Sequence, residues 1–397
     1  MTAEACAFKI LVVDDEPDLE MLVRNRFRKE IKQKDFEFVF AHNGQEALDK
    51  LREDASIDLV MSDINMPVMD GLTLLSRLSA TDRIVKAVIV SAYGDMQNIR
   101  TAMNRGAYDF LTKPIDFDDF QVTVSKTRRA LEEIKQGAHA REQLSAIQQE
   151  LRVATRIQQS ILPTTFPPFP ERTDFSIFAR MTPAREVGGD FYDFFFLDDD
   201  RLAFLIGDVS GKGVPAAILM AVTRTLLRAT AMTGGSAGEC LAYVNSVLLR
   251  QSESDMFVTI FYGILNTRTG ELEFSVGGHN PPLLFSPSGV VGVLHAKSPG
   301  MLVGIIEEAR YTSEHLQLRS GDGILLYTDG VTEATDTSKN EFGEERLHKV
   351  LEKACAHPVE DLVEEMICAI FAEVNTFAAG APQHDDITAM ALQYEST

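Results

Sequence analysis

The sequence predicts an N-terminal α/β domain with a doubly wound, five-stranded parallel sheet, then one long helix, then a second domain rich in strands. Three observations predict this order. Short apolar runs alternate with segments of helical spacing over residues 1–124. A stretch with one glycine and no proline follows until Pro163, and beyond it several apolar runs adjoin turns that carry aspartate. With 397 residues, the chain is long enough for two or three domains, each with its own core.

Five apolar runs rich in Val, Ile and Phe form the predicted parallel sheet. They are KILVV (9–13), FEFVFA (36–41), DLVMS (58–62), AVIVSA (87–92) and YDFLT (108–112). The segments between them have helical spacing, for example Leu19, Leu22, Val23 and Phe27. This alternation is typical of a sheet covered by helices on both faces, in which ligands collect at the carboxyl ends of the strands.

Polar and charged side chains stand at the predicted carboxyl ends of four of these strands: Asp14, Asp15, Asp63, Ser91 and Lys113. Three carboxylates at one sheet edge repel each other unless a cation lies among them, and oxygen ligands favour Mg²⁺. One carboxylate could then attack a phosphoryl donor, while the metal and the lysine neutralise the developing charge. The alternative interpretation is that these aspartates only cap the ends of strands.

The motifs VVDDE, SDINMPVMDG, VSAYGD and FLTKP resemble the receiver domain of two-component response regulators, over residues 7–124. The resemblance implies that Asp63 is the phosphoacceptor, with a sensor histidine kinase as phosphoryl donor. It also implies that Asp14, Asp15, Asp63 and the carbonyl of Asn65 hold Mg²⁺.

The same resemblance assigns three residues to the response to phosphorylation. Ser91 would hydrogen-bond to the phosphoryl group and Lys113 would pair with it. Phe110 occupies the aromatic switch position, although an ordinary core phenylalanine is the alternative. Phosphorylation of Asp63 adds about 1.5 to 2 negative charges, which can bias the packing of the last strand and helix.

Residues 125–162 predict a helical connector. Leu131, Ile134 and Ala138 keep a 3–4 spacing, and a second series does so further on: Leu144, Ile147, Leu151, Ala154 and Ile161, with Gln158 in the seam. The two series do not share one register, and the break falls near Gly137 to Arg141. A narrow apolar stripe with charged flanks indicates a coiled coil in a homodimer, whose register break could alternate between packings. The alternative is a helix packed on its own domain.

Four turns that carry aspartate recur in residues 163–397, in EVGGDFYDFF, FLIGDVSGKG, GILLYTDGVTEA and QHDDITAMAL; the aspartates are Asp190, Asp208, Asp329, Asp385 and Asp386. The second turn is not a nucleotide-binding P-loop, because only three residues separate Gly207 from Gly211 and Gly213 follows Lys212. Four such turns predict a cluster of oxygen ligands for two divalent ions, which lower the pKa of a bridging water and clamp phosphate oxygens. Four unrelated turns are the alternative.

Six motifs in this region resemble the metal-dependent PPM (PP2C-like) Ser/Thr phosphatases of the SpoIIE/RsbU type: AREVGGDFYDF, GDVSGKGVPAAILMA, MFVTIFYGILNTRTGELEF, GGHNPPLL, LLYTDGVTEA and DDIT. The resemblance covers nearly all of 163–397 and implies an α+β sandwich of two antiparallel sheets flanked by helices.

The resemblance to these phosphatases also implies roles for the aspartates, with Mn²⁺ or Mg²⁺ as the two ions. Asp208 bridges both metals, and the Val209 carbonyl completes one coordination shell. Asp329 and Asp385 hold one ion, and Asp190 binds or orients through water. Asp386 belongs to the same set, where it would hold the metal ligands in place and not bind metal directly. Which of the neighbours Asp385 and Asp386 is the ligand stays open.

Three further residues near these motifs are ambiguous. Arg185 lies five residues before Asp190, the spacing of the phosphate-contacting arginine in related phosphatases, but the intervening EVGG differs and a surface arginine is the alternative. Lys212 could face phosphate or solvent. His279 in GGHNPP fits a turn-organising residue better than a metal ligand.

Composition limits the partners. There are 59 acidic against 38 basic residues, for a net charge of −21, which disfavours nucleic acid and anionic membranes. Four scattered cysteines, Cys6, Cys240, Cys355 and Cys368, fit reduced thiols in a cytosol. MTAEACAFKI does not read as a signal peptide and no apolar run approaches the roughly 20 residues of a membrane span, so we expect a cytoplasmic protein.

We therefore expect a receiver domain (1–124), a linker (125–162) and a phosphatase domain (163–397), in which phosphorylation of Asp63 controls dephosphorylation of Ser or Thr. The resemblance implies a phosphorylated STAS-domain anti-anti-sigma factor in a partner-switching pathway as the substrate. The alternative is a catalytically weak adaptor that binds a sigma-factor regulator without turnover. A DNA-binding regulator is disfavoured, since no helix-turn-helix pattern or basic patch follows the linker.

Overall fold

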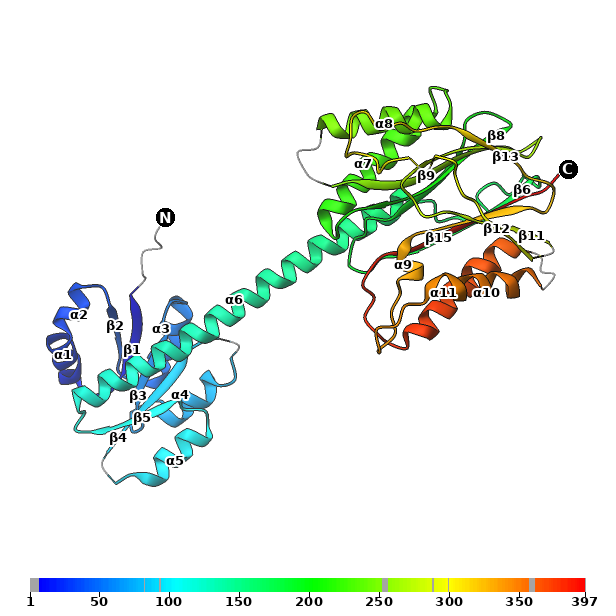
Figure 1. Ribbon diagram of the computed structural model, residues 1–397. Coiled ribbons are helices and arrows are strands. Elements are labelled where there is room, and N and C mark those ends of the chain that lie inside the picture. Colours follow the sequence, from blue (N-terminus) through cyan, green and yellow to red (C-terminus); the bar gives the residue numbers. More distant parts are fainter. Residues whose placement is uncertain are drawn as a thin grey trace. The chain divides into compact units, whose positions relative to one another are not determined.

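The computed structural model describes residues 7–81, 83–92, 94–251, 256–287, 289–298, 300–356 and 361–396. The chain divides into two compact units, Met1–Ile147 and Gln148–Thr397, and each is considered by itself (Figure 1). Helix α6 (Phe117–Ile161) contributes to both units. Cys6, expected to be a reduced thiol, and Tyr93 of the VSAYGD motif lie outside the described residues.

The first unit contains a five-stranded sheet in the order β2-β1-β3-β4-β5, and every neighbouring pair is parallel. Its strands are β1 (Phe8–Val13), β2 (Phe36–Ala41), β3 (Leu59–Asp63), β4 (Lys86–Ala92) and β5 (Asp109–Lys113). The predicted doubly wound parallel sheet is confirmed, and each strand end lies within one residue of its predicted position.

Helices cover both faces of this sheet, which explains why its strands are apolar on both sides. One face packs against α1 (Pro17–Arg26), α2 (Arg28–Lys32) and the start of α6 through a core that includes Ile10, Val12 and Phe120. The other face packs against α3 (Gly44–Glu53), α4 (Gly71–Leu78) and α5 (Met96–Asn104) around Leu11 and Val13. The strand ends that carry the predicted site therefore sit on a rigid scaffold.

Helix α6 confirms the predicted helical linker and runs without a break through Gly137. Its first turns bury Phe120, Val124 and Leu131 in the core of the first unit, so the helix begins before the predicted linker does. Every residue from 132 to 150 is exposed. The helix ends at Ile161, two residues before Pro163, which cannot continue it. The pairing of two such helices into a coiled coil stays a prediction.

The second unit is a sandwich of two five-stranded sheets, in the orders β13-β10-β9-β8-β7 and β12-β11-β14-β15-β6, with antiparallel neighbours throughout. The first sheet has β7 (Phe191–Phe196), β8 (Arg201–Val209), β9 (Val258–Asn266), β10 (Glu271–Gly277) and β13 (Glu314–Gln317). The second has β6 (Phe175–Thr182), β11 (Leu283–Ser286), β12 (Gly289–Val293), β14 (Gly323–Tyr327) and β15 (Ile387–Tyr394).

Helices lie on the outer face of each sheet (Figure 1). The first sheet is covered by α7 (Val214–Ala231) and α8 (Ala237–Gln251), and the second by α10 (Gly343–Cys355) and α11 (Leu362–Ala378). Strand β15 is buried along its whole length because Met390 and Leu392 enter the core between the sheets while Ala389 and Ala391 face α10 and α11. The predicted α+β sandwich is confirmed.

Helix α7 is the one helix in the described part of the chain that is long and apolar enough to span a membrane, judged by length and composition alone. It has a buried stripe of Ala216, Met220, Thr223, Leu227 and Ala231 that packs on the first sheet. Arg224 Nη2 and Arg228 Nη1 lie 2.9 Å and 3.1 Å from a carboxylate oxygen of fully buried Asp193 on β7. An apolar stripe and a buried ion pair thus hold α7 on the sheet.

Candidate functional site

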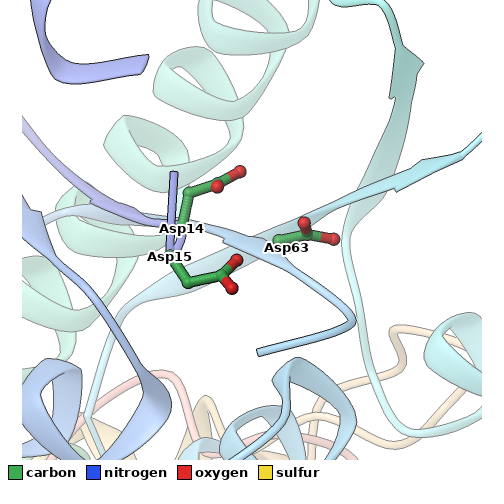
Figure 2. Close-up of side chains that lie close together, drawn as sticks. All are labelled: Asp14, Asp15 and Asp63. Carbon is green, nitrogen blue, oxygen red and sulfur yellow. The ribbon is translucent and has the colours of Figure 1, made fainter. Parts of the chain in front are cut away.

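Three aspartates come together at the carboxyl ends of β1 and β3. Asp14 and Asp15 directly follow β1, and Asp63 is the last residue of β3. Because β1 and β3 are parallel neighbours, their ends lie at one edge of the sheet. One carboxylate oxygen from each aspartate lies within 4.8 Å of the others (Figure 2). Asp14 and Asp63 are buried, whereas Asp15 is exposed.

Lys113, at the end of β5, supplies the positive charge of this cluster. Its Nζ lies 2.6 Å from Asp63 Oδ2, 2.9 Å from Asp14 Oδ2 and 3.3 Å from Glu16 Oε1. Burial lowers the pKa of Lys113, but the bonds to Asp63 and Asp14 outweigh it and leave the pKa above its usual value. Burial also raises the pKa of Asp14, against the opposing effect of Lys113. The lysine is therefore held charged between two carboxylates.

The remaining receiver residues lie around this edge. Asp63 pairs in register with Val90, so Ser91 stands one residue further along β4, and its Oγ lies 3.4 Å from Asp95 Oδ2. Asn65 is exposed next to the cluster, with its backbone N–H 3.4 Å from Asp63 Oδ1. Phe110 on β5 is 37% exposed and belongs to neither core of the unit, so it is not an ordinary core phenylalanine.

Asp190 is the most deeply buried aspartate of the predicted phosphatase set, with 1% of its surface exposed. It directly precedes β7, and its Oδ2 accepts hydrogen bonds from Thr328 Oγ1 at 2.8 Å and Thr388 Oγ1 at 2.6 Å. Burial, followed by the charges of Asp208 and Asp386, raises its pKa well above the usual value. Two hydroxyl groups orient a carboxylate that is costly to ionise.

Asp208 and Asp329 interact electrically with the rest of this set. Asp208 lies near the end of β8, and burial followed by the charge of Asp329 raises its pKa to about 7. Asp329 opens the short helix α9 (Asp329–Thr332) after β14, and burial followed by the charge of Asp385 raises its pKa. Within the described ranges, only Asp14, Asp15 and Asp63 bring three acidic oxygens within 4.8 Å of one another. The carboxylates of Asp208, Asp329 and their neighbours thus influence each other's pKa without forming an equally tight group.

Asp385 and Asp386 differ in what they bind. Asp385 Oδ2 lies 2.9 Å from Lys212 Nζ, which also donates a hydrogen bond to the His384 carbonyl. Asp386 accepts backbone N–H groups on both oxygens, from Ala184 at 2.8 Å and from Gly189 at 2.6 Å. Asp386 therefore organises the loop that leads to Asp190, whereas Asp385 is held by one cation.

Gly189 shows how closely the backbone approaches this site. A Cβ there would come within 2.8 Å of the Val209 carbonyl oxygen, so only glycine fits without movement. The Val209 carbonyl accordingly lies against the residue that precedes Asp190. Arg185 is exposed, and its Nη1 lies 4.0 Å from where a Cβ of Gly213 would be.

His279 is buried beside this site and its Nδ1 lies 2.8 Å from Thr259 Oγ1. Thr259 is the register partner of Asp208 across β8 and β9. Burial lowers the pKa of His279 to about 4, so the ring is neutral at neutral pH. The neutral imidazole thus bonds to strand β9.

Sequence reasoning gave no role to Thr328 and Thr388, which bind Asp190. Thr328 lies in LLYTDG next to Asp329, and Thr388 lies in DDIT two residues after Asp386. Their closeness in sequence to predicted metal ligands is the signal that could have indicated a supporting role. In the sequence, Gln158 is a polar residue within an apolar seam. It is buried, and its side-chain amide donates to the Gly188 carbonyl at 2.6 Å and accepts from the Gly188 N–H at 3.1 Å.

The donor chemistry of both clusters fits hard divalent cations. The side-chain donors are carboxylate oxygens, and in the second unit the Val209 carbonyl oxygen lies against Gly189, the residue before Asp190. The raised pKa values of Asp190, Asp208 and Asp329 show carboxylates that burial and mutual repulsion disfavour as anions. A divalent cation would offset that repulsion.

Comparison with known proteins gives two family matches. Residues 10–125 match the response regulator receiver domain, and residues 198–395 match Stage II sporulation protein E (SpoIIE). Protein IcfG of Synechocystis sp. is 32% identical over 272 residues, which cover 61% of this chain and 41% of that protein. The chain thus spans less than half the length of IcfG.

One further relative and one solved structure are also similar to this chain. Phosphoserine phosphatase RsbU of Bacillus subtilis is 29% identical over 249 residues, or 62% of this chain and 70% of RsbU. The solved SiaA-PP2C domain of Pseudomonas aeruginosa has a TM-score of 0.55 at 21% identity, covering 64% of this chain and 98% of that domain. This last likeness supports the fold of the sandwich. The chain therefore belongs to the two-component response regulators, with an N-terminal receiver domain and a C-terminal PPM-type domain of the SpoIIE family.

Proposed function

We propose that this response regulator is a metal-dependent phosphoprotein phosphatase for Ser or Thr, controlled by phosphorylation of Asp63. The receiver (1–124) would act through the linker (125–162) on the phosphatase domain (163–397). The observation that carries the proposal is the set Asp190, Asp208 and Asp329, of which the first is buried and the other two are half-buried. Burial, followed by the charges of neighbouring aspartates, raises the pKa of each. Carboxylates whose pKa is shifted by burial and by a specific charged neighbour are typical of functional sites. Similarity to the phosphoserine phosphatase RsbU supports the same conclusion.

In this proposal Asp190, Asp208, Asp329 and Asp385 hold two Mn²⁺ or Mg²⁺ ions, with the Val209 carbonyl as a further ligand. When bound, such a pair supplies Lewis acidity and activates water, so that hydrolysis of a phosphate ester needs no protein nucleophile. Thr328 and Thr388 orient Asp190, and Asp386 holds the loop from Ala184 to Asp190 through its backbone. Arg185 remains a candidate for contacting phosphate.

The receiver domain would receive the signal as phosphorylation of Asp63. Asp63 would accept a phosphoryl group from a sensor histidine kinase, with Mg²⁺ held by Asp14, Asp15, Asp63 and the Asn65 carbonyl. Lys113, at 2.6 Å from Asp63 Oδ2, is placed to balance the added charge. Ser91 stands at the same sheet edge as a hydrogen-bond donor to the phosphoryl group. Phe110 on the adjacent β5 would respond as the aromatic switch.

The proposed substrate is a phosphorylated STAS-domain anti-anti-sigma factor in a partner-switching pathway. The proposed place of action is the cytoplasm, without nucleic acid or membrane as partner. The free thiols of Cys240, Cys355 and Cys368 and the net charge of −21 support this setting.

We propose a homodimer formed through the linker helix. An apolar groove of about 290 Å³ runs between the end of α6 and the start of α7, lined by Ile157, Ile161, Val214 and Ile218 among others. Ile157 and Ile218 are 58% and 61% exposed. Exposed aliphatic side chains at helical spacing are what a second helix covers in a coiled coil.

Turnover of a phosphorylated STAS protein with and without Mn²⁺ tests the enzymatic proposal. Wild-type protein should release phosphate only with the metal. Asp208→Asn should lower turnover at least 100-fold while the fold is kept, because the predicted bridging ligand loses its charge. Asp199→Asn, an exposed aspartate on the loop before β8, is the matched control. Binding of the STAS protein without any metal-dependent release of phosphate would instead support the adaptor.

Beryllofluoride, a mimic of the phosphoryl group, tests the control by Asp63. Turnover should change on its addition in the wild-type protein and stay constant in Asp63→Asn. Equal turnover with and without the mimic in the wild-type protein would contradict receiver control while leaving the phosphatase itself intact.

A further inference from the structure

One lysine is folded back onto the phosphatase carboxylates. Lys212 lies in the short turn between β8 and α7, flanked by Gly211 and Gly213 with φ of 90° and 77°. Residues other than glycine rarely adopt such angles, so the two glycines allow the chain to reverse at this position. The Lys212 Nζ reaches Asp385 Oδ2 at 2.9 Å and the carbonyl of His384.

Lys212 is the one Lys or Arg that forms an ion pair with Asp190, Asp208, Asp329 or Asp385 within the described ranges. Its charge also acts on two further acidic groups, lowering the pKa of Asp329 and of Glu333 against the larger effect of burial, which raises both. The charge of Lys212 therefore acts on Asp385, Asp329 and Glu333.

Lys212 also lines a cavity that opens beside this set. The cavity has a volume of about 370 Å³, and its wall includes Lys212, Gly330, Glu333, Asn375, Gln383 and Asp385. Among its lining residues Lys212 is the sole Lys or Arg. Lys212 and Asp385 are partly exposed, at 38% and 39% of their side-chain surface, so the cavity can be reached from solvent.

Divalent cations would compete with Lys212 for Asp385. The four carboxylates proposed as ligands carry four negative charges, which two divalent cations match. With Asp385 bound to metal, the Lys212 ammonium at the mouth of the cavity is free to pair with another anion. A phosphate monoester is an anion, and lysine binds phosphate as a point charge.

We infer that Lys212 binds the phosphoryl group of the substrate, and that the adjoining cavity receives the residues that flank the phosphorylated Ser or Thr. This inference rests on the proposed phosphatase function and names the residue that recognises its substrate. It assigns to Lys212 the contact that spacing alone suggested for Arg185. Arg185 is exposed near Gly213 and does not line the cavity.

The same geometry makes Lys212 a competitor of metal for Asp385. Removing its charge should leave the dissociation constant for Mn²⁺ unchanged or make binding tighter. A lysine that served only to hold the 383–386 loop in place would give the opposite result, because its loss would loosen Asp385 and weaken Mn²⁺ binding. Metal affinity therefore separates substrate binding from a structural role.

The test compares Lys212→Gln, Lys212→Arg and Arg185→Gln with Lys353→Gln, an exposed lysine on α10 that controls for the loss of one positive charge. Calorimetry measures Mn²⁺ binding, and then the binding of inorganic phosphate to the Mn²⁺-loaded protein. Turnover of a phosphorylated STAS protein gives kcat and KM.

Lys212→Gln should weaken phosphate binding and raise KM about tenfold, the loss expected for one charge-assisted hydrogen bond, without weakening Mn²⁺ binding. Lys212→Arg should keep phosphate affinity within about threefold, and Lys353→Gln should match the wild type. The inference is overturned if Lys212→Gln keeps its phosphate affinity, if Arg185→Gln loses it instead, or if Lys212→Gln weakens Mn²⁺ binding. A wild-type protein that binds phosphate through Lys212 but hydrolyses no substrate would refute the phosphatase proposal and not the binding site.

Discussion

Asp208 couples the stability of the second unit to pH, because burial, followed by the charge of Asp329, raises its pKa to about 7. An acid with a higher pKa in the folded than in the unfolded chain binds its proton more tightly when folded. Its stabilising effect is therefore complete below the unfolded pKa and is lost as pH rises through the folded one. The metal-free protein should therefore lose stability as pH rises from the usual pKa of aspartate toward about 7.

The variant Asp208→Asn should flatten that pH dependence, since asparagine resembles the protonated acid at every pH. Thermal unfolding of the metal-free protein at pH 5 and pH 8 measures the effect. Tm should be higher for the variant than for wild type at pH 8 and similar at pH 5. Asp199→Asn, at an exposed position, should follow the wild type. A variant that unfolds at lower temperature than wild type at pH 8 would contradict the prediction.

Single residues differ in how far sequence could place them. Asp14, Asp63 and Lys113 could be placed because each ends or follows a strand of one parallel sheet, whose geometry brings the ends together. The contacts of Lys212 with Asp385 and of Thr388 with Asp190 join positions 173 and 198 residues apart. No local pattern encodes such pairs, so the lysine remained ambiguous and the threonine had no predicted role.

At the scale of elements, the last turns of α6 hold the loop that leads to Asp190. Gln158 makes two hydrogen bonds to Gly188, and Thr155 Oγ1 donates to the Glu186 carbonyl at 2.6 Å. A Cβ at Gly188 would come within 2.3 Å of Asp386 Oδ2, so this stretch of loop is also pressed against the residue that organises it. A displacement of the helix end would thus move the backbone next to a predicted metal ligand.

Gln158→Leu keeps the size of the side chain but leaves the backbone N–H and C=O of Gly188 without these partners. Each unpaired buried group costs about 1–3 kcal/mol. We expect a lower Tm and at least tenfold weaker Mn²⁺ binding by calorimetry, because the loop before Asp190 loses its support. Gln159→Leu changes the exposed neighbour and serves as control. Equal Mn²⁺ affinity in the two variants would show that the helix end does not position the site.

The elements of the first unit were more predictable than those of the second. Its three central strands are buried on both faces, and all five strands form continuous apolar runs in the sequence, so their ends could be found within one residue. The arrangement of the sandwich followed only from the resemblance to phosphatases, because strand order in antiparallel sheets depends on contacts between distant segments. The linker helix begins at Phe117, earlier than its predicted start at 125, since its first turns complete the receiver core.

At the scale of the whole molecule, α6 is the element shared by the first and the second unit. Each unit has hydrophobic cores of its own. Residues 132–150 of the helix are exposed, and a Cβ at Gly137 would meet no atom within 4 Å. Substitutions at Gly137 therefore change the stiffness of the helix without disturbing packing in either unit.

Gly137→Ala and Gly137→Pro test whether an unbroken helix carries the signal from Asp63. Alanine favours the helix by about 1 kcal/mol over glycine, whereas proline in a helix interior costs about 3 kcal/mol and breaks it. Turnover with and without beryllofluoride should show a full response in Gly137→Ala. In Gly137→Pro the response should fall below about twofold while Mn²⁺-dependent basal turnover persists, because the phosphatase unit keeps its own cores and site. If the proline variant responded like the wild type, helix continuity would not be the route, and the receiver would have to act on the phosphatase through direct contact.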